Sequence, residues 1–504
     1  MSDTCAVSVL EAIRTIAFVG DLAMGQPTDH SWRASCLARR LARVTGGSDE
    51  LCAEASIVAL LRWSGCTANA HEFAQLFGDD VAQRESLLAL PSSGSGFRQS
   101  TQENVAAFFA LSKIHCEVAG DIAGLLGLSE STQFALRHLF ESFDGHGAPD
   151  GLAGDAVPPA VYLAAAAGDL EIFHRIYGLQ QACYLIGQRA GRQYPHHVAE
   201  AAMAHAREWL MELEADGAHE EAQFFAHSLP ATRAPLEVLA DVVDLKLPWL
   251  TGHSRLAATL ARDAARRLGL NERMQQRLYG AGLIHGIGRT AVPNMIWDTP
   301  AKLSESAWER VRLVPYWTSR AGKLLRSLED EVRLASFAYE RLDGSGYFRG
   351  LTAPDIPLEG RILAAAVAMA ALRGPRPWRD AFTSRQAGEL LLAEANNGRF
   401  EKSVVRALLP EEQQGLMAKP ATFSAPSILT DREREVLRYI SLGASNKAVA
   451  LKLSISASTV RTHVESVFRK LECTTRAAAT LKAAQLGLLE PVTLPDERLK
   501  EFGS

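Results

Sequence analysis

The chain has 504 residues, of which 47% are hydrophobic and 22% are charged, with a formal net charge of −5. This composition is ordinary for a folded soluble protein, and the length predicts about two to four domains. No run of about 18 apolar residues occurs, so we expect no membrane span. The N-terminus lacks the layout of a signal peptide. Seven scattered cysteines without a Cys-x-x-Cys pair predict reduced thiols and a cytoplasmic location.

Helix-forming residues dominate the chain, and alternating β-branched runs are scarce, which predicts an all-α protein. We expect two tandem helical domains, at residues 1–215 and 228–410. Residues 411–428 are polar and contain two prolines, so they are predicted to be a linker. Residues 429–490 are predicted to form the last domain. The Ser/Gly-rich segment 91–96 is predicted to be a flexible loop.

The first two predicted domains share an internal repeat. Four motifs recur in the same order: His30-Ser31 as His253-Ser254, Leu60-Leu61-Arg62-x-x-Gly65 as Leu283-Ile284-His285-x-x-Gly288, Asp144-Gly145-x-Gly147 as Asp343-Gly344-x-Gly346, and Val157-Pro158 as Ile356-Pro357. Arg62 and His285 each follow the first His of their copy by 32 positions. The first copy has 24 additional residues between the second and third motifs. Four matches in shared order predict a duplicated domain.

The second copy resembles the HD-GYP family over most of its length. The matching residues are His253, Leu283-Ile284-His285-Gly286-Ile287-Gly288-Arg289, Glu340-Arg341-Leu342-Asp343-Gly344-Ser345-Gly346-Tyr347 and Arg361-Ile362. That family is an all-helical hydrolase of cyclic di-GMP with a centre of two or three metal ions. The resemblance therefore implies two tandem HD or HD-GYP-like helical domains.

Most of the ligand positions implied by this resemblance are changed in the second copy. His253 and His285 are kept, but Gly286 replaces the neighbouring Asp and Arg289 replaces the general-base Lys. The remaining positions hold Val314, Ala338, Tyr339 and Val367. A hydrolytic metal pair needs several converging His and carboxylate ligands. We therefore predict no metal, no cofactor and no enzymatic activity, with His253 and His285 as a neutral core pair.

The first copy departs further from the family. His30 and His115 match two ligand positions. Arg62 and Trp63 replace the His-Asp doublet, and Leu139 and Phe140 replace the paired histidines. We predict no metal binding in this copy either.

A helical domain that has lost its metal ligands can keep a cavity. The predicted ligand pocket at the old site of the second copy is lined by His285, Arg289, Tyr339, Arg341, Asp343 and Tyr347. Arginines in this region could bind an anion, or they could form ordinary ion pairs. Cyclic di-GMP is suggested as the effector by the family resemblance alone.

Residues 429–490 are predicted to form a helix-turn-helix domain of four helices. Thr430 and Glu433 have the spacing of a capping box, which begins the first helix. A short second helix is expected over 445–453 and a third over 457–471. The third has an apolar stripe at helical spacing: Val460, Val464, Val467, Phe468 and Leu471. Its polar outer face suits the major groove of DNA.

The charge of this segment differs from that of the rest of the chain. Residues 430–490 hold ten Lys or Arg and six Asp or Glu, whereas the whole chain is acidic. The segment resembles the LuxR-type domain at Leu429-Thr430-x-Arg432-Glu433-x-Glu435-Val436-Leu437, Ser445-Asn446-Lys447, Ser458-Thr459-Val460-x-x-His463-Val464 and Thr475-Arg476. The resemblance implies binding of double-stranded DNA. In that family the last helix, here about 475–486, often makes a two-fold contact, so a homodimer is expected.

The predicted DNA-binding residues fall into two groups. Arg461, Thr462 and Glu465 are placed to face base edges, where Arg favours guanine and a carboxylate favours cytosine. The others are expected to lie near phosphates or on the outer face: Asn446, Lys447, Thr459, Arg469 and Lys470.

Three hypotheses for function follow. The first is a DNA-binding transcriptional regulator whose catalytically inactive HD-GYP-like domains sense a small molecule or dimerise. The second is an active cyclic di-GMP phosphodiesterase fused to a DNA-binding domain. The third is a constitutive DNA-binding dimer with no ligand.

Overall fold

The prediction of an all-α protein is confirmed by the computed structural model, which describes residues 5–89, 102–215, 224–225, 229–409 and 428–489. The only named strands in these residues are β1 (Ala6–Ser8) and β2 (Arg233–Pro235), which pair antiparallel. This ribbon ties the start of the chain to the start of its second half. The predicted linker, apart from Ile428, and the predicted loop 91–96 lie outside the described residues.

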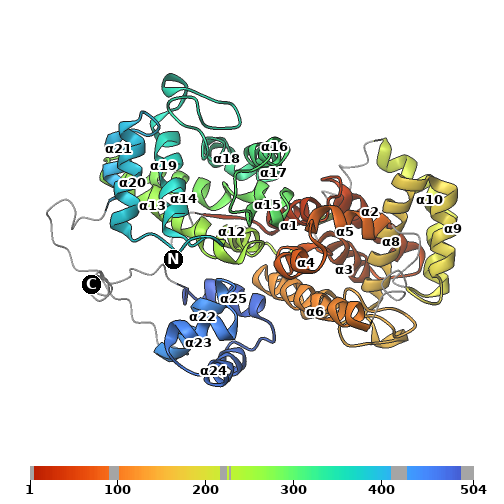
Figure 1. The fold of residues 1–504 in the computed structure, drawn as a ribbon. Coiled ribbons are helices and arrows are strands. Elements are labelled where there is room, and N and C mark those ends of the chain that lie inside the picture. The colour runs from red at the N-terminus through yellow and green to blue at the C-terminus, as the bar shows by residue number, and fades with distance from the viewer. Residues whose placement is uncertain (1–4, 90–101, 216–223, 226–228, 410–427, 490–504) are drawn as a thin grey trace.

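The first half of the chain forms one group of helices, drawn red to yellow in Figure 1. Its helices are α1 (Val9–Ala23), α2 (His30–Val44), α3 (Asp49–Leu60), α4 (Ala70–Phe77), α5 (Asp80–Ala89), α6 (Gln102–Leu125), α7 (Glu130–Arg137), α8 (Pro159–Tyr177), α9 (Leu179–Arg189) and α10 (His196–Glu214), with short 3-10 helices η1 (Ser64–Cys66) and η2 (Gly154–Ala156).

The second half forms a neighbouring group, drawn green to cyan in Figure 1. Its helices are α12 (Glu237–Asp244), α13 (His253–Arg267), α14 (Glu272–Ile284), α15 (Asn294–Trp297), α16 (Glu305–Arg312), α17 (Val314–Gly322), α18 (Glu329–Ala335), α19 (Leu358–Arg373), α20 (Ser384–Asn396) and α21 (Lys402–Leu408), with 3-10 helices η3 (Pro248–Leu250), η4 (Ile287–Ala291), η5 (Arg326–Leu328) and η6 (Ala353–Asp355). The two groups together are called the body below.

The two halves make the same buried hydrogen bonds at corresponding positions. Asp21 accepts from the backbone N and the Oγ of Ser31, and Asp244 accepts from the same two groups of Ser254. Later in each half, a buried glutamate, Glu141 or Glu340, accepts backbone N–H groups of the following glycine-rich loop. Such shared contacts are expected of a duplicated domain.

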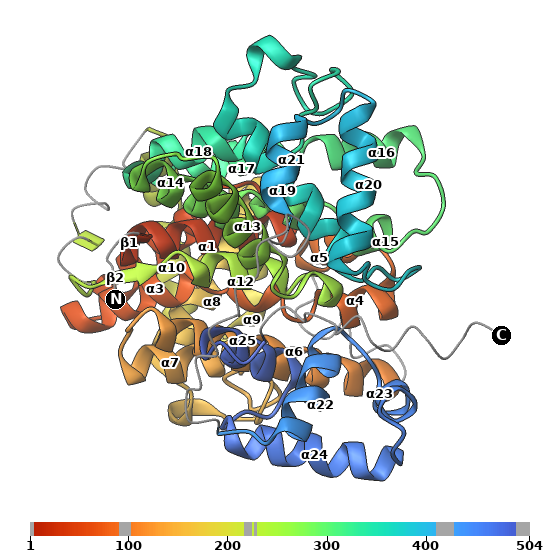
Figure 2. The same cartoon turned by 90° about the vertical axis from the view of Figure 1, so that its left-hand side faces the viewer.

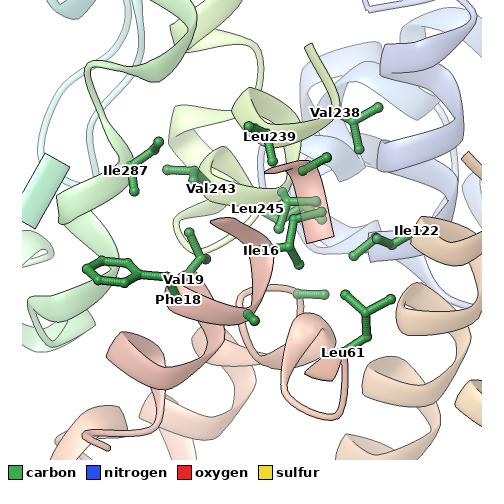
Figure 3. Packing of buried hydrophobic residues seen from close by; sticks show 14 of the residues in the cluster. Ile16, Phe18, Val19, Leu61, Ile122, Val238, Leu239, Val243, Leu245 and Ile287 are labelled. Carbon is green, nitrogen blue, oxygen red and sulfur yellow. The ribbon is translucent and has the colours of Figure 1, made fainter. Parts of the chain in front are cut away.

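An apolar interface joins the two halves. Ile16, Phe18 and Val19 of α1 are buried and lie beside Val243 of α12 and Ile287 of η4 (Figure 3). Burying each such side chain contributes about 1.5–3 kcal/mol relative to leaving it in water. The first half therefore helps to hold α12 and η4 in place, and both elements contribute residues to the site described below.

The last four helices form a separate small domain, drawn blue in Figure 1: α22 (Asp431–Ser441), α23 (Asn446–Leu453), α24 (Ala457–Lys470) and α25 (Arg476–Gln485). The predicted capping box is present, because the Thr430 side chain accepts from Glu433 N and the Glu433 carboxylate accepts from Thr430 N. Val460, Val464 and Val467 are buried, as the apolar spacing predicted. The bounds of α23, α24 and α25 agree with the predicted ones to within one residue, and α22 begins directly after the predicted cap Thr430.

Candidate functional site

The outer face of α24 is polar and open to solvent. Arg461 and Glu465 lie one turn apart with side chains 76% and 62% exposed, and Arg461 Nε donates to Glu465 Oε1 at 2.9 Å. Thr459 and Thr462 are exposed on the same helix. Figure 2 places α24 on the side of its domain away from the body, with α25 nearer to the body. An exposed ion pair contributes little stability, so Arg461 can exchange Glu465 for a DNA base at small cost.

Two of the predicted DNA-binding residues are engaged inside the domain. Asn446 Oδ1 accepts from Arg476 Nη2 at 2.7 Å, and Lys470 Nζ donates to Glu433 Oε2 at 2.7 Å. Burial raises the pKa of Glu433, but hydrogen bonds from Lys470, Thr430 and Ser466 outweigh it and hold the pKa at about 2. Lys447 and Arg469 are exposed and remain candidates for phosphate contacts.

A buried cluster of two histidines and one arginine lies in the second half of the body. His253 begins α13, His285 ends α14, and their ring centroids are 5.6 Å apart. Arg289 of η4 donates through Nη2 to His253 Nε2 at 3.0 Å and to His285 Nε2 at 2.8 Å. His285 Nδ1 donates to the carbonyl oxygen of Gly282 at 2.6 Å, which leaves Nε2 as the acceptor.

Electrostatics keep both imidazoles neutral. Burial and, after it, the charge of Arg289 together lower the pKa of His285 to about 3. The same two causes hold the pKa of His253 well below its usual value. Across the cluster, burial raises the pKa of Asp244 to about 7, against the opposing effects of Arg289 and Ser254. Asp244 Oδ1 lies 3.8 Å from Arg289 Nη1.

This donor set does not fit the metal pair of the HD-GYP family. The guanidinium of Arg289 lies between the imidazoles and occupies the lone pairs that a metal ion would use. Within the described residues, no group of three or more His, Cys, Asp or Glu side chains could hold a metal ion. We therefore assign no reaction step to a metal ion at this cluster.

The structure brings together four of the six predicted pocket residues. The Tyr339 ring lies 6.0 Å from the His285 ring and stacks on Tyr347 at 5.1 Å, beside Arg289 and the histidine pair. By contrast, Arg341 lies over the Phe400 ring, and Asp343 is exposed and accepts from Ser345. Two buried polar atoms at the cluster have no hydrogen-bond partner, Arg289 Nη1 and Tyr339 Oη.

Sequence analysis missed Asp244. A usable signal was present, because an aspartate precedes Ser31 and Ser254 by ten positions in both copies. In the first half, His30 contacts the buried carboxylate of Glu171 instead of an arginine, so the two halves have different chemistry at matching places.

Comparisons with known proteins agree with this architecture. The family model described as "HD domain" matches residues 237–404, and the model described as "Bacterial regulatory proteins, luxR family" matches residues 427–483. The chain joins an HD domain to a LuxR-family regulatory domain. None of its described helices is both long enough and apolar enough to cross a bilayer.

Several curated proteins are similar to the body. The 3'3'-cGAMP-specific phosphodiesterase 3 of Vibrio cholerae is 26% identical over 408 residues, covering 75% of this chain and 88% of that protein. The 3'3'-cGAMP-specific phosphodiesterase 1 of the same organism is 31% identical over 208 residues, and this chain covers about half of its length, 48%. A crystal structure of a V. cholerae cyclic GMP-AMP phosphodiesterase, V-cGAP3, has the same fold, with a TM-score of 0.56, 22% identity and coverage of 81% of this chain and 99% of that one.

These relatives contradict the prediction that the chain is not an enzyme. They are named as phosphodiesterases of cyclic dinucleotides, and the match to one of them spans most of the body. The prediction was wrong because it compared single positions with one family's ligand pattern. A fold gathers donors from distant parts of the sequence, as Asp244 illustrates, so lost positions do not exclude hydrolysis.

Proposed function

We propose that the chain combines two activities: binding of DNA through α24, and action on a cyclic dinucleotide through its HD body. The observation that carries the first activity is the outward, unobstructed polar face of α24 in a LuxR-family domain. A protruding helix with Arg461 at its centre suits the major groove. The acidic remainder of the chain disfavours contact between the body and DNA phosphates.

For the second activity, the support comes from the relatives and from the buried cluster. Arg289 Nη1 and Tyr339 Oη are polar groups without hydrogen-bond partners, and an unsatisfied buried group gains free energy when a ligand pairs with it. A phosphate oxygen accepts hydrogen bonds from both groups. Hydrolysis of the bound nucleotide is favoured by the relatives, which are named for that activity.

One helix connects the two activities. Asp244 of α12 lies at the histidine–arginine cluster, and Asp241, one turn earlier, accepts from Gln485 Nε2 of α25 at 2.6 Å. Residues three apart on a helix share a face, so a shift of α12 moves both contacts together. We propose that occupancy of the HD site changes DNA binding through α12.

The α12–α25 contact is part of a larger docking surface. Thr474 N and Oγ1 donate to the carboxylate of Glu117, and Lys482 Nζ lies 3.7 Å from Asp121 Oδ1. Glu117 and Asp121 both belong to α6. Thr251 Oγ1 donates to Ser441 O at 3.0 Å.

We propose that the chain forms a homodimer on DNA. A dimer made through α25 would first require that helix to separate from α6 and α12.

Calorimetric titration of the full chain with 3'3'-cGAMP and with cyclic di-GMP tests the nucleotide activity. We expect saturable binding of at least one of them, because the Arg289 guanidinium and the Tyr339 hydroxyl each present an atom without a hydrogen bond at the cluster. The same samples are assayed for linear product with and without added divalent metal. Arg289→Lys keeps the charge but loses the bidentate donor, so it should weaken binding by about tenfold. Absence of both binding and turnover for both nucleotides would refute this half of the proposal.

A further inference from the structure

Three possible metal ligands meet in the first half of the body, away from the histidine–arginine cluster. Cys66 Sγ of η1 lies 3.2 Å from Met24 Sδ at the end of α1 and 3.7 Å from His115 Nδ1 of α6. All three side chains are buried, with exposed fractions of 5% for Met24, 3% for Cys66 and 2% for His115. They come from three elements that are far apart in the sequence.

The imidazole of His115 is oriented as a ligand. Its Nε2 donates to the carbonyl oxygen of Arg62 at 2.8 Å, so the lone pair of Nδ1 faces Cys66. Metal-binding histidines are typically fixed in this way by a hydrogen bond from the other ring nitrogen. Burial lowers the pKa of His115 to about 3, which keeps the ring in its neutral, ligating form.

We propose that Met24, Cys66 and His115 form a binding site for one soft monovalent metal ion of the Cu(I) class. Thiolate and thioether sulfur select such ions over hard cations. On binding, the Cys66 thiol releases its proton to solvent and its sulfur forms the bond to the metal. Thiolate and monovalent ion together are neutral, which suits a buried site.

The surroundings disfavour a divalent ion. Arg84 Nη1 donates to the Cys66 carbonyl oxygen at 3.0 Å. Burial raises the pKa of the Cys66 thiol to about 11, and the charges of Arg84 and Lys246 oppose that rise. A divalent ion would leave one uncompensated positive charge beside Arg84, since Lys246 is already paired with Asp80. Zinc, which takes thiolate and imidazole ligands but not a thioether, is therefore expected to bind more weakly than Cu(I).

The two contacts that Cys66 makes need one small adjustment for such a site. With metal–sulfur bonds of about 2.3 Å and a metal–nitrogen bond of about 2.0 Å, a trigonal site separates sulfur and nitrogen by about 3.7 Å and the two sulfurs by about 4 Å. The sulfur–nitrogen separation of 3.7 Å already agrees. The sulfurs must move apart from 3.2 Å, which the flexible methionine side chain allows.

The matching position in the second half supports this assignment. The repeat aligns Cys66 with Arg289, because each directly follows the glycine that ends the shared Leu-containing motif. In the second half the guanidinium of Arg289 supplies a tethered cation between two imidazoles. In the first half, the position of Arg289 is occupied by Cys66, whose sulfur would bind a metal cation instead. Met24 and Cys66 lie outside the HD-GYP ligand pattern, so the proposed site shares only His115 with the positions of that family's metal centre.

Anaerobic titration of the reduced full chain with Cu(I), against a chromophoric chelator, tests the proposal. We expect one tight site, and X-ray absorption should show two sulfur neighbours and one nitrogen neighbour. Met24→Leu conserves volume and should remove one sulfur neighbour and weaken binding about tenfold. Cys66→Ser should weaken binding about 100-fold or more. Cys52→Ala, which alters a buried cysteine elsewhere in the core, is the matched control and should change nothing.

Ag(I), which has no accessible oxidation, is the second probe, and it should raise the melting temperature of the wild-type chain more than that of Met24→Leu. Two results would overturn the site. One is equal Cu(I) affinity in the wild type and Met24→Leu; the other is tighter binding of Zn(II) than of Cu(I).

Discussion

Replacing Lys246 with methionine should destabilise the full chain by about 3–5 kcal/mol, because it leaves a buried carboxylate without its counter-ion. Lys246 Nζ lies 2.5 Å from Asp80 Oδ2, and the two side chains are 1% and 0% exposed. Asp80 also accepts from Asn294 N at 2.7 Å, and Asn294 Nδ2 donates to Lys246 O at 2.9 Å. The pair thus joins α5 of the first half to the segment after α12 and to α15.

Urea unfolding followed by circular dichroism measures this loss. The double variant Lys246→Met with Asp80→Asn removes both charges, so it should recover a large part of the lost free energy of unfolding. A loss below about 1 kcal/mol in the single variant would show that the pair does not hold the halves together.

Arg461→Ala should reduce the discrimination between operator and random DNA by about 1–3 kcal/mol, because its exposed guanidinium is placed to pair with a base edge. Binding is measured by fluorescence anisotropy with both duplexes at fixed salt, since salt alone changes affinity strongly. Arg333→Ala removes a similarly exposed, ion-paired arginine from α18 of the body and serves as the control. An equal loss on both duplexes would mean that Arg461 contacts phosphate and does not read sequence.

The sequence predicted those parts of the fold that depend on local chemistry. The capping box at Thr430 and Glu433 began α22 where expected, and the spacing of Val460, Val464 and Val467 gave the buried side of α24. The repeat of His30 and His253 was also visible, because both histidines are followed by a serine. The structure shows that each serine donates to a buried aspartate. Such patterns can be predicted from the sequence because capping and apolar spacing involve residues only a few positions apart on one helix.

Contacts between distant residues could not be predicted in the same way. Met24, Cys66 and His115 are separated by 42 and 49 positions and follow no metal-binding spacing. The docking of Gln485 on Asp241 joins residues 244 positions apart. Arg341 and Asp343 were assigned to the pocket from their motif, yet Arg341 lies over the Phe400 ring and the exposed Asp343 accepts from Ser345. Tertiary packing alone determines which of these distant residues come into contact.

The most direct test of the account is the affinity of the full chain for its operator, measured with and without saturating 3'3'-cGAMP or cyclic di-GMP. We expect at least one nucleotide to change the dissociation constant about fivefold or more, as α12 links the HD site to α25. In Gln485→Ala, which removes the contact to Asp241, that change should shrink while nucleotide binding persists. Operator affinity that is the same with and without either nucleotide, or no binding of DNA at low salt, would contradict the account.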